Sequence, residues 1–456
     1  MIDRLMMHWR DFNSSGSASE LLAPINSSSK CDGAKSGRFG LVQGIVAAVV
    51  FLAVVFPIGW HPSWTAAGNE PSAPVASQKP NVVETPSRGD FSRYELLRVD
   101  PERHGLLARC EGKLVLIVSG KPAEMGRAQG RLLAGPIQYL VERVLYGVGA
   151  YDSVESGTWF FDRMEEIHRR TSPFIPSRYF EEIDALAEAA GLSQRDARFA
   201  NLFPERFHCS GVAVRGEATR DGRVIHARVL DYMRDINLQG CAVVQVFVPE
   251  GRHAWMSLGY AGLVGTVTAM NEAGLAVGEM GGGGEGHWDG MPMTLLLREI
   301  MERAGTVQEA LKILQETPRT CEYYYVFSDR SGDLAAVRAV PEEVLVLKPG
   351  QQHPLLPPVP RDTVFISADE RARVLSERLH ENFGRIDVPT MIEIIKRPVA
   401  MRSNLHNAIM TPQTLDMWVA DAGRTTPACD EPYVRVNLRE LLDLYRNTLS
   451  AGTVSR

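Results

Sequence analysis

Cys209 is the residue in this sequence that is best placed to act as a nucleophile. It lies in Phe207-His-Cys-Ser-Gly211, where a helical sequence pattern gives way to a β-strand pattern. A free cysteine is only a few per cent thiolate near neutral pH, so it needs a base. Cleavage of the bond between His208 and Cys209 would supply one, because the freed α-amino group has a reference pKa of about 7.7–8.0. The same thiol would make the cut by attacking the carbonyl carbon of His208, giving a thioester that water hydrolyses.

Other familiar catalytic motifs are missing. The sequence contains no GxSxG, no HExxH and no paired CxxC, so an α/β-hydrolase serine and the usual zinc sites lack support. Gly259, Gly262 and Gly265 form GxxGxxG rather than the dinucleotide-binding pattern, and we interpret them as turn glycines. The four glycines at 281–284 predict a loop, either a plain one or one that lines a pocket. No metal and no organic cofactor is implied.

The sequence that begins at Cys209 carries a family resemblance. It runs CSGVAVRGEATRDGRVIHARVLDY, which resembles the start of the mature chain in the acyl-coenzyme A:6-aminopenicillanate (isopenicillin N) acyltransferase-like family of self-cleaving N-terminal-nucleophile cysteine hydrolases. Further similarities occur in the family's order, and together they span about 110–425: VSGKPAEMGRAQG at 118–130, MNEAGLAV at 270–277, NLHN at 404–407 and MWVA at 417–420. The resemblance implies that Cys209 acts at a free N-terminus.

The resemblance also implies which residues surround the nucleophile. Arg228 and Asp231 match the family's Arg-x-x-Asp motif and would hold the thiolate and ammonium charges. From the residues alone, the alternative is an ordinary surface ion pair. An asparagine that helps to form the oxyanion hole is expected late in the chain, yet the corresponding stretch 364–371 has none. Loss of one oxyanion donor costs about 10²–10³ in rate, so the gap matters. The candidate oxyanion or substrate contacts are Asn271, Ser367 and Asn404.

The hydrophobic pattern divides the globular part of the chain at Cys209. Helical periodicity dominates 123–201, and 91–208 is expected to form a helical, propeptide-like segment. Strands that follow strands through close turns predict antiparallel sheets, and clustered helices beside them indicate an α+β fold. The resemblance implies a four-layer αββα sandwich in which 209–456 is the catalytic segment. The expected strands are 224–230, 242–248, 255–259, 275–277, 323–327 and 344–347, and helices are expected near 292–303 and 307–315.

The first 90 residues are expected to lie outside the globular part. An apolar run at 39–60 is just long enough to cross a bilayer, and the basic residues nearest to it precede it. The positive-inside rule then predicts a cytoplasmic tail at 1–38 and a catalytic part that is periplasmic or extracellular. We favour an uncleaved signal-anchor helix over a cleaved signal peptide, because the tail is long for a signal peptide. The proline-rich 61–90 predicts a disordered linker.

Composition narrows the function further. The 456 residues are 45% hydrophobic and 23% charged, with a formal net charge of −6, so neither a wholly disordered chain nor a basic surface for nucleic acid is expected. The resulting hypothesis is a membrane-anchored, self-cleaving cysteine amidohydrolase or acyltransferase. It would form an acyl-thioester on Cys209 from a small, linear, non-peptide amide, and its two segments would remain together as a heterodimer. The alternative is a membrane-tethered binding protein that keeps the scaffold without catalysis.

Overall fold

The structure is a computed structural model that describes residues 91–202, 208–232 and 234–451. The predicted anchor at 39–60 and the predicted linker at 61–90 lie outside these residues. In the part of the chain that is described, no helix is both long and apolar enough to cross a membrane. The described residues all fall in one compact unit.

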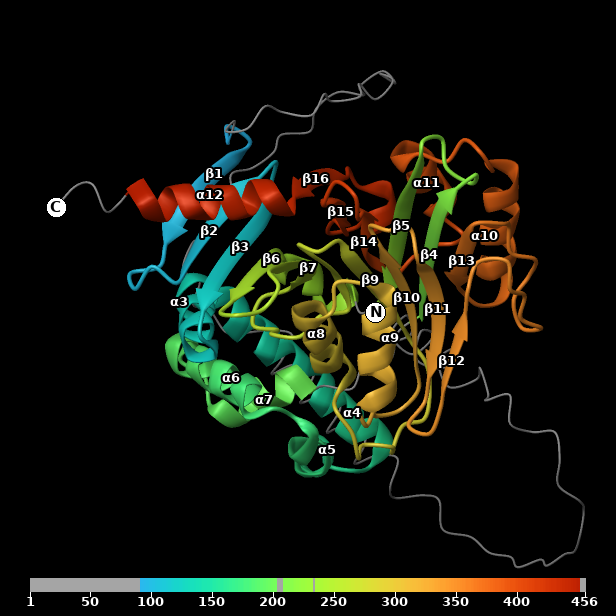
Figure 1. Cartoon of the computed structure of the whole chain (residues 1–456). Helices are drawn as coiled ribbons and strands as arrows, with labels where there is room; N and C mark the ends of the chain where they lie inside the picture. The colour runs from blue at the N-terminus through green and yellow to red at the C-terminus, as the bar shows by residue number, and fades with distance from the viewer. Residues whose placement is uncertain (1–90, 203–207, 233, 452–456) are drawn as a thin grey trace, which may run out of the picture. The chain divides into compact units, whose positions relative to one another are not determined.

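The described strands form two sheets (Figure 1). Neighbouring strands pair antiparallel, as the sequence predicts, except that β3 and β6 run parallel. Sheet A has ten strands in the order β1 (Tyr94–Val99), β2 (Gly105–Cys110), β3 (Lys113–Gly120), β6 (Ala242–Pro249), β7 (Trp255–Tyr260), β8 (Thr268–Asn271), β9 (Leu275–Gly281), β10 (Tyr323–Asp329), β11 (Leu334–Ala339), β12 (Val344–Leu347). Sheet B has six, in the order β13 (Thr363–Ile366), β4 (His208–Gly216), β5 (Gly222–Asp231), β14 (Asn404–Thr411), β15 (Asp416–Asp421), β16 (Val434–Asn437).

The two sheets contact each other through β9 and β10 of sheet A and β4 and β5 of sheet B. Gly211 of β4 permits this close approach, because a Cβ at that position would lie 2.8 Å from Met280 Sδ on β9. Helices α8 (Met293–Arg303) and α9 (Val307–Glu316) pack on sheet A, and α10 (Asp369–Glu381) and α11 (Val388–Ile395) lie by sheet B (Figure 1). The C-terminal helix α12 (Leu438–Ala451) follows β16.

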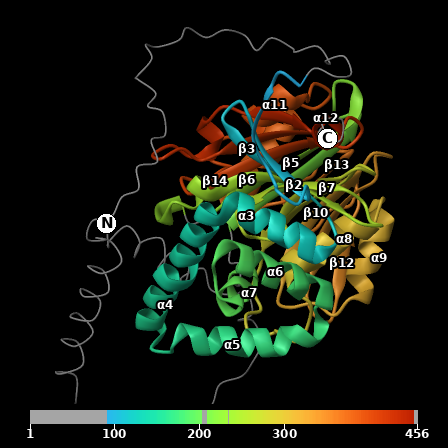
Figure 2. The same cartoon turned by 90° about the vertical axis from the view of Figure 1, so that its left-hand side faces the viewer.

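A second group of helices comes before Cys209, and its first helix lies beside β2, β3 and β6 (Figure 2). It consists of α3 (Pro122–Val141), a π-helical turn (Glu142–Val148), α4 (Gly149–Ser156), α5 (Phe160–Thr171), α6 (Ser177–Ala190) and α7 (Gln194–Leu202). The expectation that all of 91–208 is helical is wrong at its start, because 94–120 forms β1, β2 and β3. These strands join sheet A through the parallel pairing of β3 with β6, so the segment before Cys209 supplies part of the sheet. The apolar run Leu114–Val118 is the feature of the sequence that indicates a strand there.

The strands and helices predicted after Cys209 are confirmed within a few residues. The family-like stretch 118–130 spans the step from a strand to a helix, because β3 ends at Gly120 and α3 begins at Pro122. The glycines in that segment serve helix packing: a Cβ on Gly126 would lie 2.1 Å from the Glu182 carbonyl oxygen, and one on Gly130 would lie 2.6 Å from the Leu186 carbonyl oxygen. Helix α6 therefore contacts the backbone of α3 directly.

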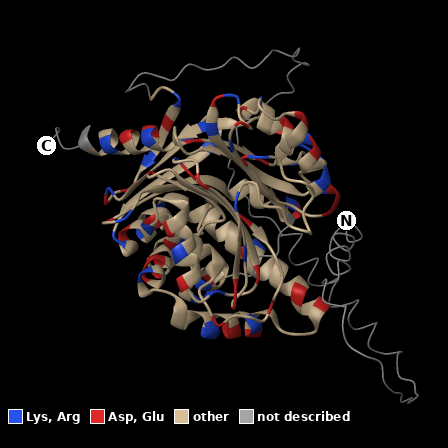
Figure 3. Cartoon of the chain, turned by 45° about the vertical axis from the view of Figure 1, so that its right-hand side comes forward, with Lys and Arg blue, Asp and Glu red and all other residues tan. Residues whose placement is uncertain are grey.

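Charged residues are mixed in sign along the helices, and most of the strand surface carries neither sign (Figure 3). The sheets and the helices that cover them instead share three clusters of buried apolar side chains. The largest cluster contains side chains from the helices before Cys209 together with side chains from sheet A and Cys209 itself. The two segments on either side of residue 208 therefore fold around one core.

Candidate functional site

The predicted nucleophile lies at the start of a central strand of sheet B. Strand β4 begins at His208, and its second residue, Cys209, pairs with Leu230 of β5. The strand has β13 on its other side. Cys209 is a free thiol with 5% of its surface exposed. The bond predicted to be cut therefore joins the first two residues of a paired strand. The preceding residues 203–207 lie outside the described part of the chain.

Strand alternation decides which side chains share a face with this thiol. Residues opposite each other on paired strands point to the same side, and so do residues two apart. Leu230 is opposite Cys209, and Arg228 is opposite Gly211, so both lie on the thiol's face. Ser210 and Asp231 occupy the alternating positions and lie on the other face of sheet B.

Arg228 is wholly buried between the two sheets. Its Nη2 lies 3.4 Å from Glu279 Oε2 on β9, and both side chains have no exposed surface. Gly278 makes room for this arginine, since a Cβ there would lie 2.5 Å from Arg228 Cγ. Among the described residues, Nε and Nη1 of Arg228 have no hydrogen-bond partner. The guanidinium thus brings a positive charge and free N–H groups to the thiol's face of the sheet.

The electrostatics of the intact chain keep the thiol protonated. Burial raises the pKa of the Cys209 thiol to about 12, although the positive charge of Arg228 opposes this shift. The carboxylates of Glu279 and Asp231 raise the pKa further, and the Asp231 backbone N–H lowers it. Burial also raises the pKa of Glu279, against the lowering effect of Arg228. Cys209 in the uncut chain therefore needs a nearby base before it can react.

Asp231 ends β5, directly opposite His208. Its Oδ2 accepts a hydrogen bond from Arg371 Nη1 at 3.0 Å, and its Oδ1 accepts one from the Met401 backbone N–H at 2.9 Å. Burial raises the pKa of the Asp231 carboxyl to about 6, and Arg371 opposes this rise. Arg371 is a residue that the sequence analysis missed, although it lies in the stretch that was searched for an asparagine.

The three candidate oxyanion contacts lie in three different places. Ser367 directly follows β13, and its hydroxyl is 2.7 Å from that of Ser210, on the face of β4 away from the thiol. Asn404, on β14, donates to the Leu230 carbonyl at 3.0 Å and to Asn407 Oδ1 at 2.9 Å, and it accepts from the Cys429 N–H.

Asn271 is engaged elsewhere. Its amide group donates to the carbonyl oxygens of Met301 and Ala304 at 2.9 and 2.6 Å, and its Oδ1 accepts from the Leu275 N–H. These bonds tie the turn between β8 and β9 to the end of α8. The structure therefore brings Cys209 and Arg228 together on one face of sheet B. Asp231 and Ser367 lie across the sheet, and Asn271 is bound up in a turn.

Two buried histidines near the site are engaged with other residues. His226 Nδ1 lies 2.9 Å from Ser328 Oγ, and burial lowers the pKa of this imidazole to about 3. His406 contacts the Tyr260 hydroxyl through Nδ1 and the Thr268 hydroxyl through Nε2, and burial again lowers its pKa. Neither ring forms a hydrogen bond with Cys209 in the described structure. Within the described residues, neither imidazole is therefore placed as a hydrogen-bonded base for this thiol.

A pocket of about 840 Å³, which includes space open to solvent, lies beside the thiol's neighbour Leu230. Most of its lining is apolar, with several hydroxyl groups and no charged side chain among the described lining residues. The lining residues are Leu140, Val144, Ala200, Asn201, Leu230, Tyr232, Leu238, Ser257, Gly259, Tyr260, Leu263, Gly265, Thr266, Val267 and Thr294. Both sides of residue 208 contribute to this pocket. The glycine run at 281–284 does not line it, whereas Gly259 and Gly265 do.

No three or more His, Cys, Asp or Glu side chains gather as a metal-binding group within the described ranges. The buried charges near the thiol are instead two arginine–carboxylate pairs, Arg228 with Glu279 and Arg371 with Asp231. Such an arrangement can stabilise a thiolate or a developing oxyanion by charge and by N–H donation. Glu279 was also missed from the sequence. The signal for it was a lone carboxylate inside the apolar strand LAVGEMG.

Comparison with known proteins supports the resemblance seen in the sequence. The family model for acyl-coenzyme A:6-aminopenicillanic acid acyl-transferase matches residues 219–349. Protein dcd1A of Dictyostelium discoideum is 24% identical over 356 residues, which is 69% of this chain and 79% of that protein. The N-acylethanolamine-hydrolyzing acid amidase of Mus musculus is 22% identical over 183 residues, 38% of this chain and 50% of that protein. Residues 219–349 are thus similar to this acyltransferase family.

Two solved structures complete the comparison. The Caenorhabditis elegans ortholog of N-acylethanolamine-hydrolyzing acid amidase aligns with a TM-score of 0.36 at 17% identity, over 45% of this chain and 93% of that one. Penicillin V acylase from Agrobacterium tumefaciens aligns with a TM-score of 0.34 at 13% identity, over 47% of this chain and 83% of that one.

Proposed function

We propose that this chain is a self-cleaving cysteine amidohydrolase or acyltransferase whose nucleophile is Cys209. Its substrate would be a small, linear, non-peptide amide. The observation that carries the proposal is the placement of Arg228. Its guanidinium is wholly buried on the same face of sheet B as the thiol, and two of its nitrogen atoms have no hydrogen-bond partner among the described residues. A buried cation is costly to maintain, so its position beside a thiol favours a role in holding negative charge there.

The first step would be cleavage between His208 and Cys209. The thiol attacks the carbonyl carbon of His208, the C–N bond of that peptide breaks, and the acyl group passes to sulfur while the nitrogen becomes a free amine. Water then hydrolyses the thioester, which leaves a carboxylate on His208 and restores the thiol. The new α-amino group of Cys209 would serve as the base for later turnovers, because its reference pKa of about 7.7–8.0 suits that role.

Turnover would repeat the same chemistry on a bound amide. The α-amino group takes the thiol proton, sulfur attacks the amide carbonyl, and the amine of the substrate leaves with that proton. The acyl-thioester is then released to water or to another amine. Arg228 would hold the thiolate and Asp231 the ammonium form of the α-amino group. Glu279 would keep Arg228 charged and in place at the thiol's face.

The pocket beside Leu230 is suited to an apolar acyl group, since none of its described lining residues carries a charge. The relatives' names indicate related chemistry, an acyl-transferase for the family and an N-acylethanolamine-hydrolyzing amidase for the mouse protein. We infer that the substrate class of this chain is an N-acyl amine. The four-layer αββα arrangement, the heterodimer of 91–208 with 209–456 and the membrane anchor at 39–60 complete the proposal.

The direct test compares the purified wild type with Cys209→Ala, and with Cys110→Ala as a matched control. Cys110 is also buried and free, but it lies in β2 of sheet A. The wild type and Cys110→Ala should be cut, with a new N-terminus that reads Cys-Ser-Gly-Val, and should release amine from a panel of N-acyl amides. Cys209→Ala should stay uncut and inactive. A wild-type protein that stays uncut yet hydrolyses amides would show that the α-amino group of Cys209 is not the base. Cys209 would remain the proposed nucleophile.

A binding protein on the same scaffold is the second candidate, and two observations favour it. The stretch 364–371 has no asparagine, and burial raises the pKa of the Cys209 thiol to about 12 in the intact chain. Labelling with a thiol-reactive acylating probe separates the two functions. An enzyme should react selectively at Cys209, whereas a binding protein should bind N-acyl amines without cleavage, labelling or turnover.

A further inference from the structure

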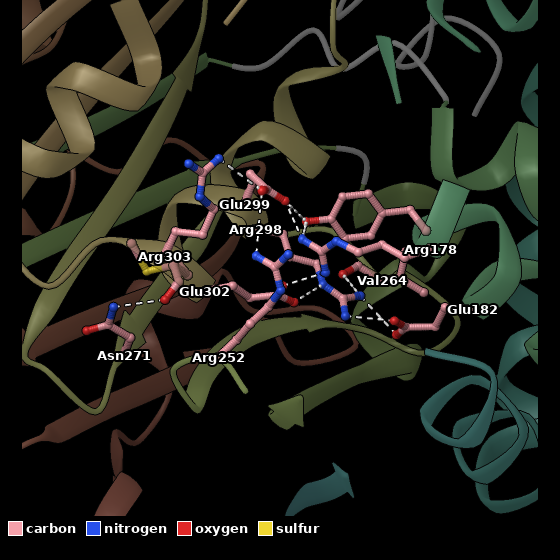
Figure 4. A network of polar contacts seen from close by, with 11 residues as sticks. Arg178, Glu182, Arg252, Val264, Asn271, Arg298, Glu299, Glu302 and Arg303 are labelled. Carbon is pink, nitrogen blue, oxygen red and sulfur yellow. Dashed lines mark hydrogen bonds and ion pairs between the residues drawn. The ribbon is translucent and has the colours of Figure 1, made fainter. Parts of the chain in front are cut away.

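A network of buried charges joins α6, which precedes Cys209, to α8, which follows it (Figure 4). From α6, Arg178 donates to Glu302 Oε2 at 2.6 Å and also contacts Glu299. In the other direction, Arg298 of α8 forms a double hydrogen bond with Glu182 of α6, at 2.9 and 2.7 Å. Arg298, Glu182 and Glu302 are almost fully buried. Each segment thus supplies charges of both signs to the other.

Arg298 makes one contact that no other member of the network makes. Its Nε donates to Glu302 Oε1 at 2.7 Å and its Nη2 to Glu182, while its Nη1 donates both to Glu182 and to the carbonyl oxygen of Val264 at 2.9 Å. Only the planar fork of a guanidinium can reach three groups in these directions at once. Arg298 therefore connects α6, α8 and the loop that contains Val264.

That loop forms a wall of the pocket. Leu263, Gly265 and Thr266 line the pocket on either side of Val264. The N–H of Val264 donates to Asn201 Oδ1 at 2.8 Å, and Asn201 belongs to α7 of the segment before Cys209. The Val264 peptide is thus held at its carbonyl by Arg298 and at its N–H by the other segment.

We propose that Arg298 is a positioning residue for the substrate pocket. Through its bonds to Glu182 and to the Val264 carbonyl, it makes the shape of the pocket wall depend on the segment 91–208. That segment is then more than a propeptide that is removed after cleavage. It must stay bound to the rest of the protein for the pocket wall to keep the shape that accepts substrate. The kinetic part of this inference rests on the proposed amidase function, while the structural part does not.

The test compares Arg298→Lys with Arg178→Lys in the full-length protein. Both changes keep the charge and remove a guanidinium from the same network, but Arg178 makes no contact with Val264. For a medium-chain N-acyl amine, Arg298→Lys should raise KM about ten-fold with kcat changed less than about three-fold, as expected for one lost charge-assisted hydrogen bond to the wall. Arg178→Lys should leave KM within about two-fold of the wild type.

Hydrogen–deuterium exchange supplies a readout that needs no activity. The amides of 262–267 should lose protection in Arg298→Lys and keep it in Arg178→Lys. If Arg298→Lys does not fold, Glu182→Gln should show the same changes to a smaller extent. Unchanged KM and unchanged exchange of 262–267 in Arg298→Lys would overturn the inference, and so would equal effects of both lysine variants. A wild type without amidase activity would refute the proposed function alone, because the exchange comparison would still decide the role of Arg298.

Discussion

The guanidinium of Arg228 and the carboxylate of Glu279 lie 3.4 Å apart between the two sheets, and neither has any exposed surface. The pair joins β5 of sheet B to β9 of sheet A at the level of Gly211 and Gly278, where an added Cβ would clash with the facing sheet. A charge in this position can be kept only with its partner, because removing one member leaves the other buried and unpaired. The pair therefore couples the stability of the sheet packing to the charge beside Cys209.

The first prediction separates the contribution of this pair to stability from the contribution of the Arg228 charge to cleavage and turnover. Arg228→Met should lower the free energy of unfolding by about 3–5 kcal/mol, because it leaves Glu279 buried without a partner. The double variant Arg228→Met/Glu279→Leu should recover most of that loss, since two apolar side chains replace the pair. Both variants should cut themselves and turn over amides at least about 10²-fold more slowly than the wild type. Urea unfolding measures the effect on stability, and the time course of self-cleavage measures the effect on the thiol. A double variant that cuts itself at the wild-type rate would show that the thiol does not need Arg228.

The second prediction concerns acid stability and depends on His226. Burial lowers the pKa of its imidazole to about 3, while an unfolded chain has a histidine pKa near 6.5. Below about pH 6.5 the unfolded chain binds a proton that the folded chain does not, so the free energy of unfolding falls as the pH falls. Between pH 6.5 and 4.5 this residue should cost about 2–3 kcal/mol.

The matched variant for this prediction is His226→Gln, which can keep a hydrogen bond to Ser328 and has no titrating group. Urea unfolding at several pH values should give a shallower loss of stability in the variant than in the wild type over that range. His406 is buried in the same way and should add a similar slope of its own. Parallel curves for the wild type and His226→Gln would contradict the prediction.

The third prediction concerns the acyl pocket. Leu263 is partly buried and lines the pocket, so Leu263→Trp should fill part of the space. KM for a long-chain N-acyl amine should rise about ten-fold, and KM for the acetyl analogue should change little, since one or two lost methylene contacts are worth about 1–3 kcal/mol. Leu114→Trp is the control, because Leu114 is also partly buried but lies in β3 and does not line the pocket. An equal change for long and short substrates would argue against this pocket as the acyl site.

The sequence revealed the local features of this molecule better than the long-range ones. Short-range periodicity was sufficient for the switch from helix to strand at Cys209 and for eight elements after it, which are β5, β6, β7, β9, β10, β12, α8 and α9. It did not predict β8, β11, β13 or the helices α10 to α12. The parallel pairing of β3 with β6 joins segments more than 100 residues apart, and no local pattern specifies it. The expectation of a helical 91–208 failed for a different reason. Strands β1, β2 and β3 pair with one another through short turns, and the apolar run Leu114–Val118, which indicates the last of them, was not interpreted as a strand.

The site shows the same division. Cys209, Arg228 and Asp231 were identified through a continuous motif on β4 and β5. Glu279 and Arg371 lie far from that motif in the chain and reach it only because the sheets pack face to face and α10 packs against sheet B. Arg371 lies in 364–371, where the resemblance implies an asparagine, and nothing in the local sequence indicates that an arginine there binds Asp231. A lone charged residue in an otherwise apolar strand, as at Glu279, is the signal to look for.

The last prediction concerns the contact between α3 and α6, two helices of the segment before Cys209. A Cβ on Gly126 would lie 2.1 Å from the Glu182 carbonyl oxygen, which is backbone and cannot move aside as a side chain would. Gly126→Ala should therefore push the helices apart and lower the free energy of unfolding by about 1–3 kcal/mol. Gly135→Ala is the control in the same helix, because a Cβ there meets nothing within 4 Å. That change should be neutral or stabilise by up to about 1 kcal/mol, since alanine is the better helix former. Glu182 also binds Arg298, so Gly126→Ala should weaken the association of the two segments after cleavage. Size-exclusion chromatography of the cut protein should then separate the segments at a lower urea concentration than in the wild type. Equal stabilities of the two alanine variants would show that the α3–α6 contact is looser than the structure has it.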